Sequence, residues 1–388
     1  MAMILQLPDE QGRIVPYKSL ARPLTAPVVK GFKSRVAYAA AHVVADPRNL
    51  DADGNPGVDW DATMAFRRHL WSLGFKVAEA MDTSQRGMGL NWAGAKELIA
   101  RSLAEARTIP GANLSSGAGT DHLDSAQAKS IHDVIAAYEE QMGFVEAQGG
   151  RAIMMASRAL ARVARSPDDY VKVYDRILSQ ARDKVILHWL GDMFDPQLAG
   201  YWGSADVAAA MDVVTAIIDT NRDRVEGIKI SLLDASHEIA LRRRLPKGVL
   251  MFTGDDFNYA ELIAGDAEGH SHALLGIFDP IAPAASLALQ HLDRGDRKSF
   301  HAVLDPTVVL SRRIFEAPTW NYKCGVVFLA WLNGFQDRFV MLGNHQTARR
   351  IAHYAEVFRL ADQCGLLREP GLAVTRMRQL LAENGIQQ

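Results

Sequence analysis

The stretch V-E-G-I-K-I-S-L-L-D, residues 225–234, is mostly apolar or small, as is typical of a strand buried on both faces. Lys229 stands in the middle of it. Two similar runs follow, G-V-L-M-F-T-G-D-D (248–256) and H-A-L-L-G-I-F (272–278), and a segment of helical period comes after each of the three. Strands that alternate with helices in this way favour a parallel α/β sheet.

The same alternation extends toward the N-terminus. Five more apolar runs lie at residues 35–44, 76–80, 112–118, 151–157 and 184–191, and the helices expected behind them cover 61–73, 92–106, 124–148, and segments from 167 and from 205. Eight strand-helix units without a long Pro/Gly/Ser linker predict a closed (β/α)8 TIM barrel rather than an open sheet. We therefore expect a catalytic barrel domain over residues 35–294.

Both ends of the chain extend beyond this barrel. The runs I-L-Q-L (4–7) and I-V-P-Y (14–17) flank D-E-Q-G and predict a short hairpin within an N-terminal extension, residues 1–34. Residues 295–388 have helical period almost throughout, at 297–315, 322–335, 347–364 and 370–384. They predict a C-terminal helical extension.

The composition favours a globular protein that binds small molecules. The chain has 388 residues, of which 48% are hydrophobic and 23% charged, and a formal charge of −2. It shows no basic footprint for nucleic acid and no polybasic membrane patch. Its two cysteines, Cys324 and Cys364, form no C-x-x-C pair, so no disulfide framework is expected. Without a signal peptide or membrane span, we expect a cytoplasmic location.

The barrel geometry gives Lys229 a direction. Alternate strand residues face inward, so Lys229 shares the inner face with Gly227 and Ser231, while Ile228 and Ile230 face the helices. A buried ammonium loses hydration, its pKa falls, and a neutral amine becomes available to attack a carbonyl. The alternative is that Lys229 pairs with an inward carboxylate such as Asp255 and only fills the barrel. Residue chemistry alone leaves both open.

A family resemblance separates these two alternatives. G-I-K-I-S-L-L-D (227–234), followed by M-F-T-G-D-D-F-N-Y-A (251–260), resembles the paired lysine and G-D-D motifs of the dihydrodipicolinate synthase and N-acetylneuraminate lyase superfamily. The segment 35–46 with its loop, M-D-T-S-Q-R-G-M-G-L (81–90) and V-I-L-H-W-L-G (185–191) follow in the family's order. The chain is identified as a divergent member, and its resemblance extends from about residue 35 to the C-terminal helices.

The resemblance implies roles for individual residues. Lys229 would form an imine with the keto carbon of a 2-oxo acid, usually pyruvate in this family, without a cofactor. Thr83 and Ser84 match two hydroxyl residues that hold the substrate carboxylate, and Gly254 and Asp255 match the G-D-D motif. Asp82 replaces a glycine of the family and Arg86 reverses a charge, so carboxylate binding is weakened here.

The fifth predicted strand departs furthest from the family. The family has a proton-shuttling tyrosine where this chain has His188, and histidine is a competent general acid and base near neutral pH. A hydrogen-bonded core histidine is the other interpretation. The following loop, D-M-F-D-P-Q-L-A-G-Y-W-G-S (192–204), lacks the arginine that often binds a second substrate carboxylate in the family. A hydroxylated, sugar-like or aromatic partner is therefore favoured.

Metal binding has weaker support in the sequence. His270 and His272 precede the core of the last strand and are expected at the stability end of the barrel. His188, Asp192, Asp195 and Asp255 could converge at the other end and hold a divalent cation, but no H-x-H or E-x-x-H motif lies there. No metal is expected.

These features predict a lyase or aldolase that forms a lysine Schiff base with a 2-oxo acid or related ketone and makes or breaks an adjacent C–C or C–O bond. The expected partners are a small 2-oxo acid or keto-sugar substrate and further copies of the chain, because the resemblance implies homodimers or homotetramers. The alternatives are a metal-dependent sugar aldolase or isomerase, and a barrel that only binds a ligand.

Overall fold

The computed structural model describes residues 3–51 and 53–388, and it contains a closed barrel of eight parallel strands. This confirms the predicted (β/α)8 barrel. The strands follow one another around the barrel in chain order, so that the last pairs with the first. They are β3 (Ala37–Ala40), β6 (Lys76–Glu79), β7 (Leu114–Ala118), β8 (Ala152–Met154), β9 (Val185–Leu190), β10 (Val225–Ser231), β11 (Leu250–Thr253) and β12 (His272–Leu275).

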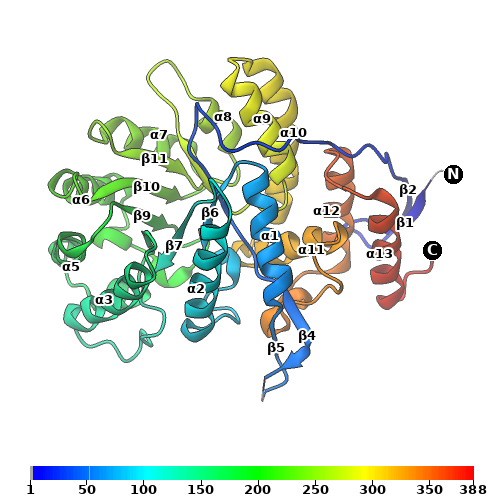
Figure 1. Cartoon of the computed structure of the whole chain (residues 1–388). Helices are drawn as coiled ribbons and strands as arrows, with labels where there is room; N and C mark the ends of the chain where they lie inside the picture. Colours follow the sequence, from blue (N-terminus) through cyan, green and yellow to red (C-terminus); the bar gives the residue numbers. More distant parts are fainter. Residues whose placement is uncertain (1–2, 52) are drawn as a thin grey trace. The chain divides into compact units, whose positions relative to one another are not determined.

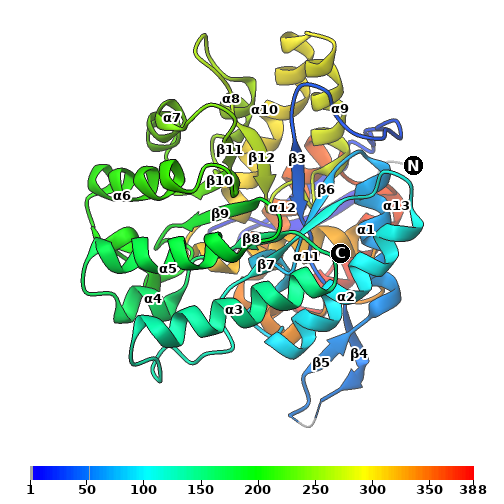
Figure 2. The same ribbon diagram turned by 60° about the vertical axis from the view of Figure 1, so that its left-hand side comes forward.

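The chain forms two compact units. The barrel unit consists of residues 35–41 and 76–276 and contains all eight barrel strands. Its helices follow the strands along the chain, and Figures 1 and 2 show α5, α6 and α7 outside β9, β10 and β11. These helices are α2 (Trp92–Thr108), α3 (Ile131–Ala147), α4 (Arg158–Val163), α5 (Pro167–Gln180), α6 (Val207–Thr220), α7 (Ala235–Arg244) and α8 (Tyr259–Ala264).

The terminal unit comprises the described residues of 1–34, 42–75 and 277–388. It contains the predicted hairpin, β1 (Ile4–Pro8) paired antiparallel with β2 (Ile14–Lys18), and a second hairpin, β4 (Ala45–Leu50) with β5 (Pro56–Val58). Its helices are α1 (Trp60–Ser72), α9 (Ala282–Asp293), α10 (Arg297–Ile314), α11 (Tyr322–Leu332), α12 (Ile351–Gln363) and α13 (Pro370–Glu383). The domain boundaries expected after residues 34 and 294 stay a prediction.

Side chains fill the inside of the barrel. The strands and the start of the loop after β6 contribute a buried cluster made of Tyr38, Ala40, Ala78, Met81, Ile153, Ile186, Phe252 and Leu274. The Tyr38 hydroxyl lies 3.2 Å from Ser115 Oγ, which satisfies both buried groups. The barrel is therefore a packed core, and space for a ligand has to be sought beyond the C-terminal ends of the strands.

Local chemistry explains where the elements differ from expectation. The third predicted helix begins at Ile131 instead of residue 124, because Ser130 and Asp133 form a capping box. The residues before Ser130 are thus released into the loop after β7. The sequence analysis missed the β4–β5 hairpin and the one-and-a-half-turn helix α4. No helix of the described ranges combines the length and apolarity needed to cross a bilayer.

Candidate active site

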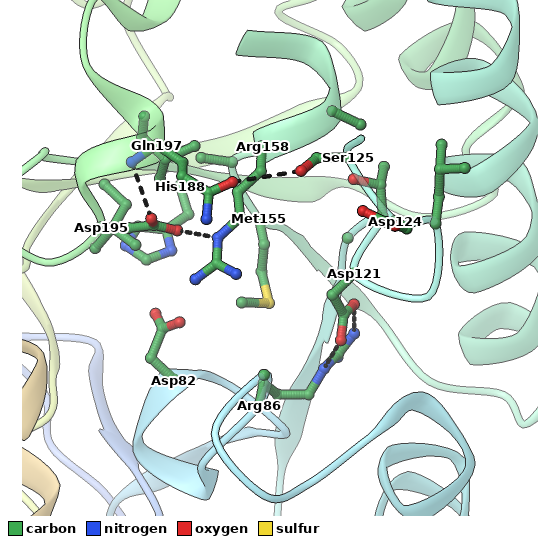
Figure 3. Close-up of a pocket in the computed structure, with 18 residues that line it drawn as sticks. Asp82, Arg86, Asp121, Asp124, Ser125, Met155, Arg158, His188, Asp195 and Gln197 are labelled. Atoms are coloured by element: carbon green, nitrogen blue, oxygen red, sulfur yellow. Dashed lines mark hydrogen bonds and ion pairs between the residues drawn. The ribbon is translucent and has the colours of Figure 1, made fainter. Parts of the chain in front are cut away.

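A cavity of about 390 Å³ opens where β6, β7, β8 and β9 end. All of its lining residues belong to the barrel unit, and Figure 3 shows side chains from four successive loops turned toward it. Its charged and titratable lining residues are Asp82, Arg86, Asp121, Asp124, Arg158, His188 and Asp195. This is the end of the barrel at which TIM-barrel enzymes bind substrates.

Lys229 lies on β10 and is only 8% exposed. It is the register partner of His188 on β9 and of Phe252, a member of the interior cluster, on β11. Burial lowers the pKa of Lys229 below its ordinary value of 10.5, against the opposing attraction of Asp256 and Asp82. In the described chain Lys229 makes no salt bridge, so the pairing with Asp255 that we considered from the sequence does not occur.

Gly254, directly after β11, makes room for the Lys229 side chain. A Cβ atom at this position would lie 2.6 Å from Lys229 Cε and 2.2 Å from Ser231 Oγ. Both distances are far shorter than van der Waals contact. A side chain at residue 254 would therefore have to displace the lysine, and glycine at this position is a steric requirement of the site.

His188 connects Lys229 with the cavity. Its imidazole lines the cavity wall and is 1% exposed, with Nε2 3.4 Å from Ser231 Oγ and Nδ1 without a hydrogen-bond partner. Burial, followed by the nearby charge of Lys229, holds the pKa of His188 well below its ordinary value of 6.5. The ring is therefore neutral around pH 7, and its buried Nδ1 has no hydrogen-bond partner in the protein.

The other sequence-predicted site residues are engaged within the protein. Thr83 and Ser84 are buried in the 3-10 helix η1 (Asp82–Ser84), and Ser84 Oγ donates to the Ala41 carbonyl at 2.8 Å. Asp255 accepts from the N–H groups of Phe257 and Asn258, and thus caps the turn before α8. None of the three lines the cavity.

Arg86 is fully hydrogen-bonded within the protein, which its sequence context did not indicate. Its five N–H donors all have acceptors: both carboxylate oxygens of Asp121, the carbonyls of Ala80 and Gly117, and Gln141 Oε1. The guanidinium therefore ties together the ends of β6 and β7 and has no donor left for a ligand. Asp82, by contrast, points its carboxylate into the cavity (Figure 3).

Arg158 is a cavity residue that the sequence analysis missed. It follows β8, and its guanidinium lies in the middle of the cavity next to Asp195 (Figure 3). The signal was present, since Arg158 directly follows the predicted strand 151–157, and residues at C-terminal strand ends of a barrel line its active site.

The residues considered as metal ligands do not form a cluster. Asp195 accepts from Arg158 and from the Gln197 N–H, while Asp255 binds the start of α8. Across residues 3–51 and 53–388, no three His, Cys, Asp or Glu side chains are grouped so that they could hold a metal ion. At the opposite end of the barrel, His272 Nδ1 accepts from the Val36 N–H at 2.9 Å.

Comparison with known proteins agrees with this geometry at the level of the fold. The profile of a family described as "Protein of unknown function (DUF993)" matches residues 5–386. No protein with curated annotation matches the sequence.

Solved structures of the dihydrodipicolinate synthase family share the fold of this chain, as the resemblance read from the motifs implied. The enzyme from Aquifex aeolicus has 11% identity and a TM-score of 0.63, over 86% of this chain and 99% of that one. YagE from E. coli K12, a prophage protein of this family in complex with pyruvate, has 13% identity and a TM-score of 0.64 over the same shares. The chloride-inhibited synthase from Acinetobacter baumannii, complexed with pyruvate, has 15% identity and a TM-score of 0.61, over 86% and 100%.

Proposed function

The chain belongs to the DUF993 family of proteins of unknown function, and we propose that it is a lyase or aldolase that uses Lys229 to form a Schiff base. Its substrate would be a 2-oxo acid or a related ketone, and the bond made or broken would be a C–C or C–O bond next to the imine carbon. Its relatives in fold include two proteins solved with pyruvate, which supports a small carbonyl compound as substrate.

The observation that carries this proposal is the state of Lys229. Burying a lysine without a salt bridge costs stability, and burial lowers its pKa. Groups with such shifted pKa values are concentrated at functional sites, which supports a chemical role for the neutral amine. The position also suits a nucleophile. Lys229 is next to the cavity residue His188, and Gly254 leaves the amine free of side-chain crowding.

The proposed reaction begins when the neutral Lys229 amine attacks the carbonyl carbon. A C–N bond forms, the carbonyl oxygen takes up protons and leaves as water, and a protonated imine remains. A bond from the carbon next to the imine carbon then breaks. Its electron pair forms the C=C bond of an enamine, and the π electrons of the protonated imine move to nitrogen. Addition of a proton or an aldehyde to the enamine carbon, followed by hydrolysis, releases the product and restores the amine.

His188 is proposed to move protons in these steps. A neutral imidazole can accept a proton at one nitrogen and donate from the other, and His188 Nδ1 has no protein partner. Thr83, Ser84, Gly254 and Asp255 would form the walls of the lysine end of the site. We also propose a homodimer or homotetramer, as the family resemblance implies, and a cytoplasmic location, as the sequence suggested.

A trapping screen tests the function. The protein is incubated with 2-oxo acids, ketones and aldehydes, with and without borohydride, and C–C bond formation or cleavage is followed by mass spectrometry of the products. We expect turnover with at least one compound and its loss on reduction. Activity that a chelator abolishes and zinc, manganese or magnesium restores would instead favour a metal-dependent sugar enzyme.

A further inference from the structure

We propose that Arg158 binds an oxyanionic group of the substrate, a carboxylate or a phosphate, that is several bonds away from the carbonyl carbon attacked by Lys229. This inference rests on the proposed function and narrows its substrate class. The inferred substrate differs from pyruvate, in which the carboxylate is bonded directly to the carbonyl carbon.

Arg158 is held in place at both ends. Its backbone follows Ser157, whose N–H donates to the Tyr201 hydroxyl at 3.0 Å and whose Oγ lies 2.6 Å from Thr120 Oγ1. Its guanidinium Nε donates to Asp195 Oδ2. Asp195 is itself fixed, because its other carboxylate oxygen accepts from the Gln197 N–H at 3.1 Å. A guanidinium fixed in this way loses little conformational entropy when it binds a ligand.

The ligand-binding edge of Arg158 is open. In the described residues its two terminal NH2 groups hydrogen-bond to no protein acceptor, and the side chain is 48% exposed within the cavity lining. Arg86 also lines the cavity, but all five of its donors are engaged within the protein, as is typical of a structural arginine. The free pair of NH2 groups matches the two oxygens of a carboxylate or phosphate.

The surroundings of Lys229 disfavour a carboxylate bonded directly to the carbonyl carbon that the lysine attacks. After β6 the N–H groups of Ser84 and Gln85 donate to Met81 and Asp82 carbonyls, and the Ser84 hydroxyl is also used. The carboxylates that act on Lys229 belong to Asp256 and Asp82. A carboxylate bonded to the carbonyl carbon would meet these like charges with few free donors, whereas a hydroxyl group could donate to Asp82.

Arg158 and Lys229 come from different parts of the barrel, so the oxyanion and the carbonyl that they would contact lie apart in the substrate. Arg158 follows β8 and Lys229 lies on β10, with β9 between them. Adjacent strands are about 4.8 Å apart, so the backbones of β8 and β10 lie about 10 Å apart. Arg158 and His188 line the cavity, whereas Lys229 lies beside His188 and does not line it. A substrate that contacts both Arg158 and Lys229 therefore extends past His188, with its oxyanion in the cavity and its carbonyl at the lysine.

Two matched sets of carbonyl compounds test this assignment by borohydride trapping at Lys229. One set compares 4-oxobutanoate with butanal, the other dihydroxyacetone phosphate with dihydroxyacetone, and pyruvate serves as the adjacent-carboxylate case. We expect at least one anionic compound to be trapped at about tenfold to hundredfold lower concentration than its neutral partner, the range for a charge-assisted hydrogen-bond pair. Whichever pair shows this preference distinguishes a carboxylate from a phosphate.

The Arg158→Gln variant should lose this preference while its trapping of neutral compounds and of pyruvate stays unchanged. Arg176→Gln is the matched control, because Arg176 is also a half-exposed arginine in an ion pair, with Glu139, but does not line the cavity. It should keep the preference. An equal preference in wild type and Arg158→Gln would overturn the inference.

Calorimetry with anions that have no carbonyl separates this inference from the proposed function. Succinate and glycerol 3-phosphate are titrated into wild type and Arg158→Gln at millimolar concentrations. Binding of either that is lost in the variant supports the Arg158 site even if no compound labels Lys229, in which case the Schiff-base proposal alone fails. Binding that Arg158→Gln leaves unchanged, or no binding by wild type, contradicts the inference.

Discussion

Lys229 on β10 and His188 on β9 are register partners on adjacent parallel strands, and the charge of the lysine contributes to the lowered pKa of the histidine. Both side chains are buried, and only His188 lines the cavity. The proposed nucleophile is thus the neighbour of the residue proposed to move protons. Because the two proposed roles belong to different residues, imine formation and proton transfer can be tested separately.

The first prediction concerns His188. In His188→Phe an aromatic ring of similar shape replaces the imidazole, so Lys229 keeps its neighbour but loses the proton acceptor. Turnover should fall by about two to four orders of magnitude, the usual contribution of general acid–base catalysis, while borohydride trapping stays detectable. Steady-state kinetics and the mass of the trapped protein measure both. Unchanged turnover would assign His188 to the core.

The second prediction concerns Gly254. Gly254→Ala places a Cβ 2.6 Å from Lys229 Cε, so the lysine must move. We expect turnover to fall by about a hundredfold, as for small misplacements of catalytic groups, and stability to fall by about 1–3 kcal/mol from overpacking. Activity assays and urea unfolding measure these effects.

The control for Gly254 is Gly143→Ala. Gly143 lies in α3, and a Cβ there meets no atom within 4 Å. This variant should keep full activity and gain about 0.5–1 kcal/mol, because alanine is preferred over glycine inside a helix. Wild-type turnover in Gly254→Ala would contradict the steric role of the glycine.

The third prediction concerns the pH dependence of Lys229 reactivity. Burial lowers the pKa of Lys229 from 10.5, so the neutral amine should become dominant at a lower pH than in an exposed lysine. Between the lowered pKa and 10.5 the unfolded chain binds more protons than the folded one, so this residue's contribution to stability rises with pH. Competitive acetylation, quantified at Lys229 and on a free peptide across pH, should show the lower midpoint for Lys229. Coincident midpoints would remove the case for an activated amine.

The fourth prediction concerns a buried carboxyl group of the barrel unit. Glu238 on α7 accepts from Ser271 Oγ at 2.6 Å, and burial raises its pKa from 4.5 to about 8. The folded state then binds more protons than the unfolded state between these values. The stability linked to Glu238 is thus complete below pH 4.5 and is lost as the pH rises through about 8.

The Glu238→Gln variant tests this linkage. It keeps the shape of the side chain but cannot ionise, so its free energy of unfolding should decline less than that of wild type between pH 5 and pH 8.5, by on the order of a few kcal/mol. Urea unfolding at several pH values measures the difference. Parallel pH profiles for the two proteins would show that Glu238 does not carry the shifted titration.

The barrel could be predicted because the same sequence pattern, an apolar run followed by a segment of helical period, is repeated along the chain. Eight apolar runs with helices between them leave few other architectures, and the inner or outer direction of each strand residue follows from a period of two. Element ends were harder to predict. Only the capping box at Ser130 explains why α3 begins at Ile131, and such local hydrogen bonds compete with the hydrophobic period that indicated an earlier start.

The site was predictable on its strands and less so in its loops. Lys229 and His188 are fixed by strand register, so their neighbourhood could be inferred. The positions of Arg86 and Arg158 depend on which carboxylate each meets, Asp121 or Asp195, and these pairs join loops that are 35 and 37 residues apart in the chain. Spacing in the sequence does not specify such pairs. As a result, one arginine is bound within the protein and the other is available to a ligand.

Identification of the labelled lysine tests the Schiff base most directly. After reduction with borohydride in the presence of the substrate, trypsin should release Val225–Arg242 carrying one label, because a modified Lys229 is no longer cleaved. The Lys229→Ala protein should stay folded, since the vacated space at the barrel mouth can take up water, and should lose label and activity together. A protein that turns over its substrate but carries no label on this peptide, or a Lys229→Ala variant that keeps its activity, would contradict the proposed mechanism.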